Sequence, residues 1–295
     1  MKKFILIISV IALIAGILFG LKGEETTNSD NAELNINSKP VQYVMLLSLD
    51  DRLLAPGQRE RDKEIIQLAF EQFEKVAKGH LLINSKDRFL VCIAPQKGND
   101  SNVKSLAQSL CFDLPKIAAK DRVATLNDFK STLSTKIDNL YNAAYKGDNS
   151  SLYDGSNIWK LFNETLPEIS NEQVDTKVIL LCDGYFDFEK GNGELKRGNR
   201  STKSDEIFET FRGKEDGIEQ MRREDYGILQ VSKAFPFVQV CVAELLPKHD
   251  DQMESDILTY IWQDWLTANG MNEPKIILSG IPAVTHPRIQ LFLNS

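Results

Sequence analysis

Residues 176–184 read TKVILLCDG, a continuous apolar run that ends in an aspartate and a glycine. A strand without polar alternation is typical of a parallel sheet whose two faces are both covered by helices. Asp183 follows the last apolar positions, and Gly184 stands where a backbone tolerant of positive φ fits well. The stretch therefore predicts a doubly covered strand that delivers a carboxylate to one edge of the sheet.

Further strand-like and helix-like patterns alternate on both sides of this run. The predicted strands cover residues 44–49, 89–94, 177–182, 237–243, 275–278 and 289–293. The predicted helices cover residues 59–78, 127–146, 157–169 and 253–268. This alternation predicts an α/β fold over residues 41–295, with a doubly wound, mostly parallel sheet flanked by helices.

Residues 184–230 interrupt the alternation with a Gly-rich, charged stretch. A loop of this length inside a compact domain is typically functional or disordered. We expect a long charged insertion that leaves the same edge of the sheet as Asp183.

The N-terminus combines two lysines with an apolar run over residues 4–21. The run is at the lower limit for a membrane-spanning helix and exceeds a usual signal-peptide core. Residues 1–23 are therefore predicted to be a signal anchor or, alternatively, a cleaved signal peptide, and residues 24–40 a polar flexible tether. By the positive-inside rule, the expected location in a bacterium is the inner membrane, single-pass with a periplasmic C-terminal domain. Cleavage would instead give a secreted protein.

Composition argues against several classes of function. The formal net charge is -7, which is unlike the basic footprint of a nucleic-acid-binding protein. The four cysteines have no CxxC or His-flanked spacing, so a zinc site is not expected. The chain has no Gly-rich phosphate loop, Gly-x-Ser-x-Gly or His-Glu-x-x-His motif. The expected partner is a protein.

Oxygen-bearing side chains follow two predicted strands and precede one predicted helix. Ser48 and Asp50 stand at the C-terminal end of the first predicted strand, and Asp183 follows the TKVILLC strand. Ser156 precedes the helix that begins next to it. Strand ends of an open α/β sheet gather ligands at one edge, and Mg²⁺ and Mn²⁺ prefer carboxylate and hydroxyl oxygens with room for water. These four side chains are therefore predicted to form a Mg²⁺ or Mn²⁺ site.

The order of these motifs resembles the von Willebrand factor type A domain, a doubly wound α/β fold. The resemblance rests on TKVILLCDG (176–184) and GSNIWKLFNETLP (155–167), and it covers about residues 41–295. Members of that family carry a metal-ion-dependent adhesion site built from Asp-x-Ser-x-Ser, a later Thr and the Asp of Thr-Asp-Gly. The resemblance implies a protein-binding module in which an acidic side chain of the partner completes the coordination of the ion.

The chain departs from the family pattern at two motifs. Cys182 replaces the Thr before Asp183, and Ser48, Asp50 and Arg52 stand where Asp-x-Ser-x-Ser would be. The resemblance thus implies a degenerate site. The Arg52 guanidinium is a candidate for an internal cation in the metal's place, paired with Asp50 or Asp183.

Two of the predicted ligands also have simpler structural roles open to them. Asp50 begins a loop, where Asp commonly makes local hydrogen bonds. Ser156 keeps the hydroxyl of the family's Thr, but it also stands at a helix start and is a candidate N-cap.

Three functions are compatible with these motifs. The leading hypothesis is a membrane-tethered extracytoplasmic protein-binding module that depends on Mg²⁺ or Mn²⁺. The alternative is a Mg²⁺-dependent phosphoryl-transfer hydrolase, with Asp50 as nucleophile and Asp183 holding the ion. The sequence favours this enzyme hypothesis less, because Arg52 stands where phosphoryl-transfer hydrolases place a second Asp. The third is a metal-free scaffold with a decayed site.

Overall fold

The computed structural model describes residues 39–97, 101–188, 194–249 and 252–295, which belong to one compact unit. The predicted signal anchor at 1–23 lies outside these residues, as does nearly all of the predicted tether. Within the described ranges, none of the helices combines the length and apolar character needed to cross a membrane.

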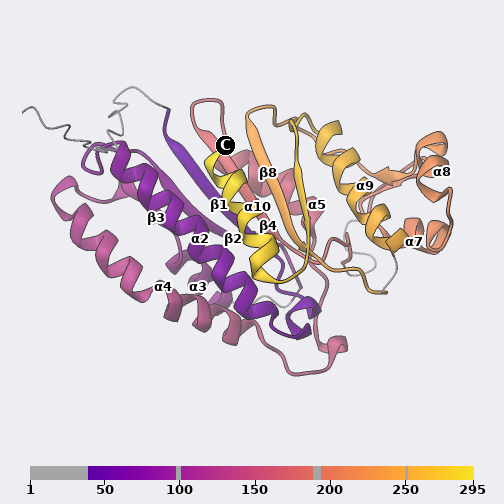
Figure 1. Cartoon of the computed structure of the whole chain (residues 1–295), viewed down its shortest axis with the longest axis horizontal. Helices are drawn as coiled ribbons and strands as arrows, with labels where there is room; N and C mark the ends of the chain where they lie inside the picture. Colours follow the sequence, from indigo (N-terminus) through magenta and orange to yellow (C-terminus); the bar gives the residue numbers. More distant parts are fainter. Residues whose placement is uncertain (1–38, 98–100, 189–193, 250–251) are drawn as a thin grey trace, which may run out of the picture. The chain divides into compact units, whose positions relative to one another are not determined.

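The described residues form a central six-stranded sheet (Figure 1). Its order is β3-β2-β1-β4-β8-β9, with β1 (Val41–Leu47), β2 (Arg88–Ile93), β3 (Phe112–Asp113), β4 (Asp175–Leu181), β8 (Val238–Leu245) and β9 (Lys275–Leu278). Neighbouring strands are parallel except β2 and β3. This confirms the predicted α/β class with a mostly parallel sheet.

The strand order reverses between β1 and β4. From β1 the chain first builds β2 and β3 on one side, and then β4, β8 and β9 on the other. Leu47 at the end of β1 pairs in register with Ile93 of β2 and with Leu181 of β4. The C-terminal ends of these three parallel strands therefore lie together at one edge.

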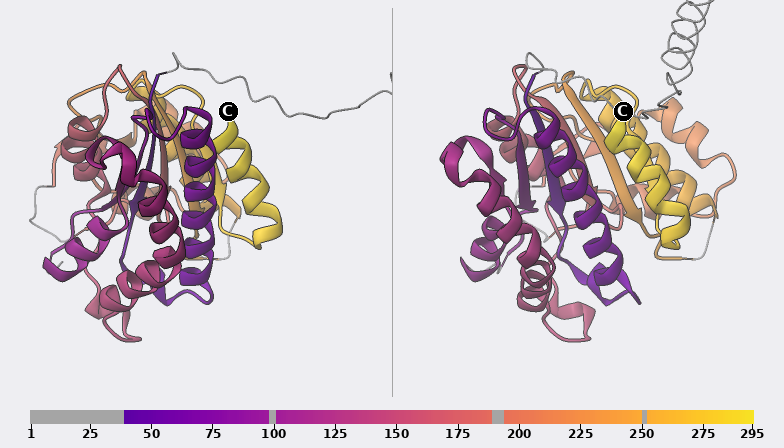
Figure 2. Two further views of the ribbon diagram at one scale, coloured as in Figure 1. Left: turned by 90° about the vertical axis from the view of Figure 1, so that its left-hand side faces the viewer. Right: turned by 60° about the vertical axis from the view of Figure 1, so that its left-hand side comes forward.

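Two hydrophobic cores, one on each face, explain why the strands read as unbroken apolar runs. On one face, Met45 and Leu47 of β1 join the core under α2 (Gln58–Gly79), α3 (Ser101–Ser109), α4 (Arg122–Ala144) and α10 (Pro282–Asn294). On the other, Val44 and Leu46 join a core with residues of the helical segment 158–169 and of α9 (Gln252–Ala268). Full burial of each such side chain contributes roughly 1.5–3 kcal/mol. Figure 2 shows α2 and α10 side by side on the first face.

The predicted strand over 289–293 is wrong. These residues lie in α10, where Ile289, Phe292 and Leu293 face the core at helical spacing. A short apolar run does not by itself separate a strand from a buried helix, and the buried residues of this run recur with the helical period. The predicted strand over 275–278 is confirmed with the same ends, and the other predicted strands and helices are confirmed with shifted ends. The helix α3 and the two-residue edge strand β3 were not predicted.

The stretch 184–230 is not a structureless loop in its described part. It contains α7 (Asp205–Phe211), α8 (Gly217–Glu224) and a small sheet of β5 (Lys196–Arg197), β6 (Arg200–Ser201) and β7 (Gly227–Ile228). Apolar residues of α7 and α8 belong to the core under α9, and these elements lie beside α9 in Figure 1. Charged residues on their outer surfaces hid this structure in the sequence.

Candidate functional site

A pocket of about 270 Å³ opens at the C-terminal ends of β1 and β4. It lies where the strand order reverses, which is the position at which open α/β sheets bind ligands. The described residues that line this strand-end pocket are Asp50, Asp51, Tyr153, Asp154, Gly155, Asp183, Tyr185, Asp187, Phe188 and Lys248. Five aspartates therefore face one lysine among them, and the pocket is strongly acidic.

Asp50 is held in the pocket wall by two local hydrogen bonds. The Ser48 hydroxyl donates to one carboxylate oxygen, and the Arg52 backbone N–H donates to the other at 3.3 Å. The second bond caps a short 3-10 helix, η1 (Asp51–Leu54), so the local structural role considered for Asp50 is confirmed. Ser48 is fully buried and orients Asp50 from behind the pocket.

Asp183 lies opposite Asp50, at the end of the neighbouring strand. Its Oδ1 accepts a hydrogen bond of 3.1 Å from the Tyr185 backbone N–H. Gly184 has φ 102°, and a Cβ there would lie 2.9 Å from the Leu245 side chain, so no other residue fits well. Burial and the nearby charge of Asp50 raise the pKa of Asp183 to about 7. Repulsion between the two carboxylates makes the pocket favourable for a cation.

Ser156 is buried next to the pocket rather than in its lining. Its Oγ accepts a hydrogen bond of 2.9 Å from Gln96 Nε2. The preceding Gly155 lets its own backbone pass close to the backbone of Asp187, since a Cβ at Gly155 would lie 2.3 Å from the carbonyl oxygen of Asp187. Ser156 therefore shapes the wall, and its role as a metal ligand stays a prediction.

The N-cap role considered for Ser156 is wrong. The cap of α5 (Ile158–Lys160) is Asn157, whose side chain accepts a hydrogen bond of 2.8 Å from the Lys160 backbone N–H. The helix continues through a π turn over 161–165 into α6 (Leu166–Ile169). Asn157 is as good a capping residue as Ser, so the sequence placed the cap one residue too early.

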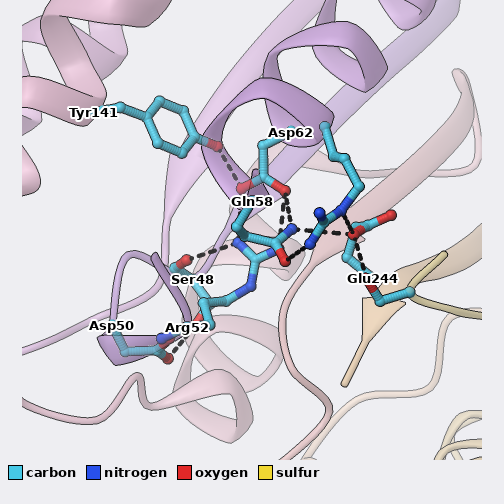
Figure 3. A network of polar contacts seen from close by, with 9 residues as sticks. Ser48, Asp50, Arg52, Gln58, Asp62, Tyr141 and Glu244 are labelled. Carbon is cyan, nitrogen blue, oxygen red and sulfur yellow. Dashed lines mark hydrogen bonds and ion pairs between the residues drawn. The ribbon is translucent and has the colours of Figure 1, made fainter. Parts of the chain in front are cut away.

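The Arg52 guanidinium does not lie in the pocket. It forms a bidentate ion pair with Asp62 of α2, with Nη1–Oδ2 and Nη2–Oδ1 distances of 2.7 and 2.9 Å (Figure 3). Only 1% of the Arg52 side chain and none of the Asp62 side chain is exposed. The expectation that Arg52 pairs with Asp50 or Asp183 is therefore wrong. Only its backbone reaches Asp50, while its side chain enters the core.

Asp62 belongs to a larger set of polar contacts beneath α2 (Figure 3). It also accepts hydrogen bonds from Tyr141 Oη at 2.8 Å and Gln58 Nε2 at 2.9 Å. Gln58 donates in turn to Glu244 Oε2, which also receives Arg61 Nε at 2.7 Å. We call Arg52, Gln58, Arg61, Asp62, Tyr141 and Glu244 the buried network. Its two arginines balance its two carboxylates.

Sequence reasoning missed the buried network although one signal was available. Asp62 lies in QRERDKE (58–64), which reads as a solvated helix start. Its spacing from Ile65, Ile66 and Ala69 places it on the buried face of the same helix. A carboxylate at such a position needs a buried partner, and Arg52 supplies it.

The carboxylate oxygens of the strand-end pocket are suitable ligands for a hard divalent cation. Asp50 and Asp183 present carboxylate oxygens from neighbouring strands, and the pocket leaves room for water. Across the described ranges, no three His, Cys, Asp or Glu side chains lie close enough together to hold a metal by themselves. Mg²⁺ keeps several waters and is commonly bound through one or two carboxylates, so the Asp50–Asp183 pair matches its usual mode.

Comparison with known proteins adds no assignment. The sequence matches no protein-family model, and no curated protein matches it significantly. Function is therefore argued from the geometry of the strand-end pocket.

Proposed function

We propose that this chain is a protein-binding module of the von Willebrand factor type A kind, whose binding site is the strand-end pocket. Two carboxylates, Asp50 and Asp183, meet at the point where the strand order reverses, and this observation carries the proposal. Counted along the chain, the strands of the sheet have the order 3-2-1-4-5-6, a doubly wound arrangement whose switch point is a ligand site.

Asp50 and Asp183 are the residues that would hold a Mg²⁺ or Mn²⁺ ion. Ser48 fixes the orientation of Asp50, and the Tyr185 N–H fixes one oxygen of Asp183. A bound ion would supply an open coordination position for an acidic side chain of the partner protein. Ser156, behind the wall, is the fourth residue of the proposed site.

The pocket and the start of the described chain lie at opposite ends of β1. The described chain enters β1 at Val41, and the pocket lies beyond the opposite end of that strand. Seven strand residues at about 3.3 Å each separate the two ends by roughly 20 Å. The pocket therefore lies at the end of β1 opposite to Val41. In the proposed tethered module, this domain is outside the cytoplasm.

The phosphoryl-transfer alternative gains no support from the contacts of the described residues. Arg52 stands where those enzymes place a second Asp, and its guanidinium is bound to Asp62. We therefore propose a binding function and not an enzymatic one.

Unfolding of the chain in EDTA, Mg²⁺ and Mn²⁺ tests the proposal. A ligand that binds only the folded state at a hundredfold excess over its Kd raises the free energy of unfolding by about 2.7 kcal/mol. We expect this rise in the wild type and its loss in Asp50→Ala and Asp183→Ala. Asp138→Ala is the matched control, because Asp138 is a half-exposed partner of Lys63 outside the pocket lining. Equal metal responses in all four proteins, or none in any, would contradict the proposed metal dependence.

A further inference from the structure

Lys248 brings a positive charge to the strand-end pocket. Its Nζ lies 3.5 Å from Asp187 Oδ2 and 4.5 Å from the centroid of the Tyr185 ring. Burial alone would lower the pKa of Lys248, but the charges of Asp183, Asp187 and Asp51 raise it. Lys248 thus lines the same pocket as Asp51 and Asp183, and its ammonium pairs with Asp187.

The base of the Lys248 side chain is fixed at the pocket rim. Its backbone N–H donates a hydrogen bond of 2.9 Å to Tyr185 Oη. Tyr185 in turn donates to Glu254 of α9, which is buried and paired with Arg212 at 3.2 Å. The backbone is thus anchored, while the flexible four-carbon stem carries the charge into the pocket.

The ammonium itself is held weakly. The Lys248 side chain is 45% exposed and its ion pair with Asp187 is long, whereas the Arg52 side chain is 1% exposed and bound by two short bonds to Asp62. Exposed lysine pairs contribute little to stability, and lysine lacks the rigid fork of arginine. The Lys248 charge can leave the pocket at low cost, and the Arg52 charge cannot leave the core.

We infer that the Lys248 ammonium is a built-in counter-ion of the strand-end pocket and competes there with a divalent cation. A cation bound at Asp183 would displace the ammonium toward solvent. This inference rests on the proposed function, because it concerns occupancy of the same site. In the sequence analysis, Arg52 was the candidate for an internal cation of the site. In this inference, Lys248 has that role.

Binding of Mn²⁺ to the full-length chain in a mild detergent, followed by the electron paramagnetic resonance signal of free Mn²⁺, tests the inference. Charges a few ångströms apart at a solvated site change a dissociation constant several-fold, and the ion carries two, so Lys248→Met is expected to bind Mn²⁺ about tenfold more tightly than the wild type. Lys248→Gln repeats the test, and Lys248→Arg keeps the charge and should retain the wild-type Kd. Lys130→Met is the control, because Lys130 pairs with Glu74 away from the pocket.

The outcomes separate this inference from the proposed function. Tighter binding by Lys248→Met than by a wild type that also binds supports both. Binding by Lys248→Met alone supports the inference and refutes metal dependence in the wild type. A wild type that binds with the same Kd as both Lys248→Met and Lys248→Gln overturns the inference and leaves the function standing. No binding by any of these proteins overturns both.

Discussion

The buried network and the strand-end pocket lie on either side of one short turn, yet their charges are balanced in opposite ways. In the buried network, Arg52 and Arg61 neutralise Asp62 and Glu244 through short contacts. In the pocket, five aspartates face one lysine. In a balanced set of buried charges, each charge depends on its partner for compensation, whereas an unbalanced set at a strand end is suited to a ligand.

The turn over η1 separates the two regions within three residues. Asp50 caps the turn and lines the pocket, while Arg52 sends its side chain to Asp62. Neighbouring charges in a sequence therefore do not have to serve the same site. The following predictions test the contrast, beginning with the largest effect.

Removing Asp62 should break the buried network. Asp62→Ala leaves the Arg52 guanidinium buried without its partner, and loss of one member of a buried pair typically costs about 3–5 kcal/mol. We expect that loss in the free energy of unfolding measured with urea. Asp138→Ala, which removes the exposed partner of Lys63, should cost less than about 1 kcal/mol. If both variants lost a similar free energy of unfolding, the Arg52–Asp62 pair would matter no more for stability than the solvated Lys63–Asp138 pair, which would contradict the account.

Titration should reveal the raised pKa of Asp183, which burial and the charge of Asp50 cause in the strand-end pocket. The pKa of Asp183 is about 7 in the folded protein, against 3.8 ordinarily, so between these values the folded state binds more protons than the unfolded state. The free energy of unfolding should therefore fall as the pH rises from about 4 to about 7. The total is a few kcal/mol, since each pH unit between the two pKa values contributes about 1.4 kcal/mol.

Asp183→Asn should flatten this pH profile when unfolding is followed in EDTA, and should be more stable than the wild type at pH 8. Asp175→Asn is the control, because Asp175 is 60% exposed and lies at the other end of β4. An unchanged slope in Asp183→Asn would show that burial and the charge of Asp50 do not raise the pKa of Asp183.

The smallest effect should come from the support of Asp50. Ser48→Ala removes the buried hydroxyl that donates to the Asp50 carboxylate, and a hydrogen bond to a charged group contributes about 1.5–3 kcal/mol. Because the Arg52 N–H still donates to Asp50, we expect a loss near the lower value in urea unfolding. Ser109→Ala, which removes an exposed hydroxyl in α3, should cost less. Equal costs would argue that Ser48 does not hold Asp50.

Much of the architecture was predictable because the apolar patterns are long. The run at 176–184 predicted β4 and the carboxylate after it, and the strand over 275–278 is confirmed with the same ends. The apolar run at 289–293 is compatible with a strand and with the buried face of a helix, and it belongs to α10. The elements within 184–230 were hidden because their buried residues are sparse among charges.

The candidate site was predictable only in part, for a physical reason. Because Asp50 and Asp183 each follow a strand, the sequence predicted that both lie at one edge of the sheet, and both line the pocket. The roles of the other charged residues depend on where their side chains point. Nothing in local spacing showed that Arg52 turns to Asp62, a residue ten positions away on α2. Lys248 lies in the segment after β8, which has no periodic pattern, so only the fold brings it to Asp187.

Anomalous diffraction from crystals of the chain grown with Mn²⁺ tests the central claim most directly. We expect one peak in contact with both Asp50 and Asp183 carboxylates at about 2.1 Å, with the Lys248 ammonium displaced from the pocket. The absence of a peak between these two carboxylates, with the Lys248 ammonium still in the pocket, would contradict the claim that the strand-end pocket holds a divalent cation.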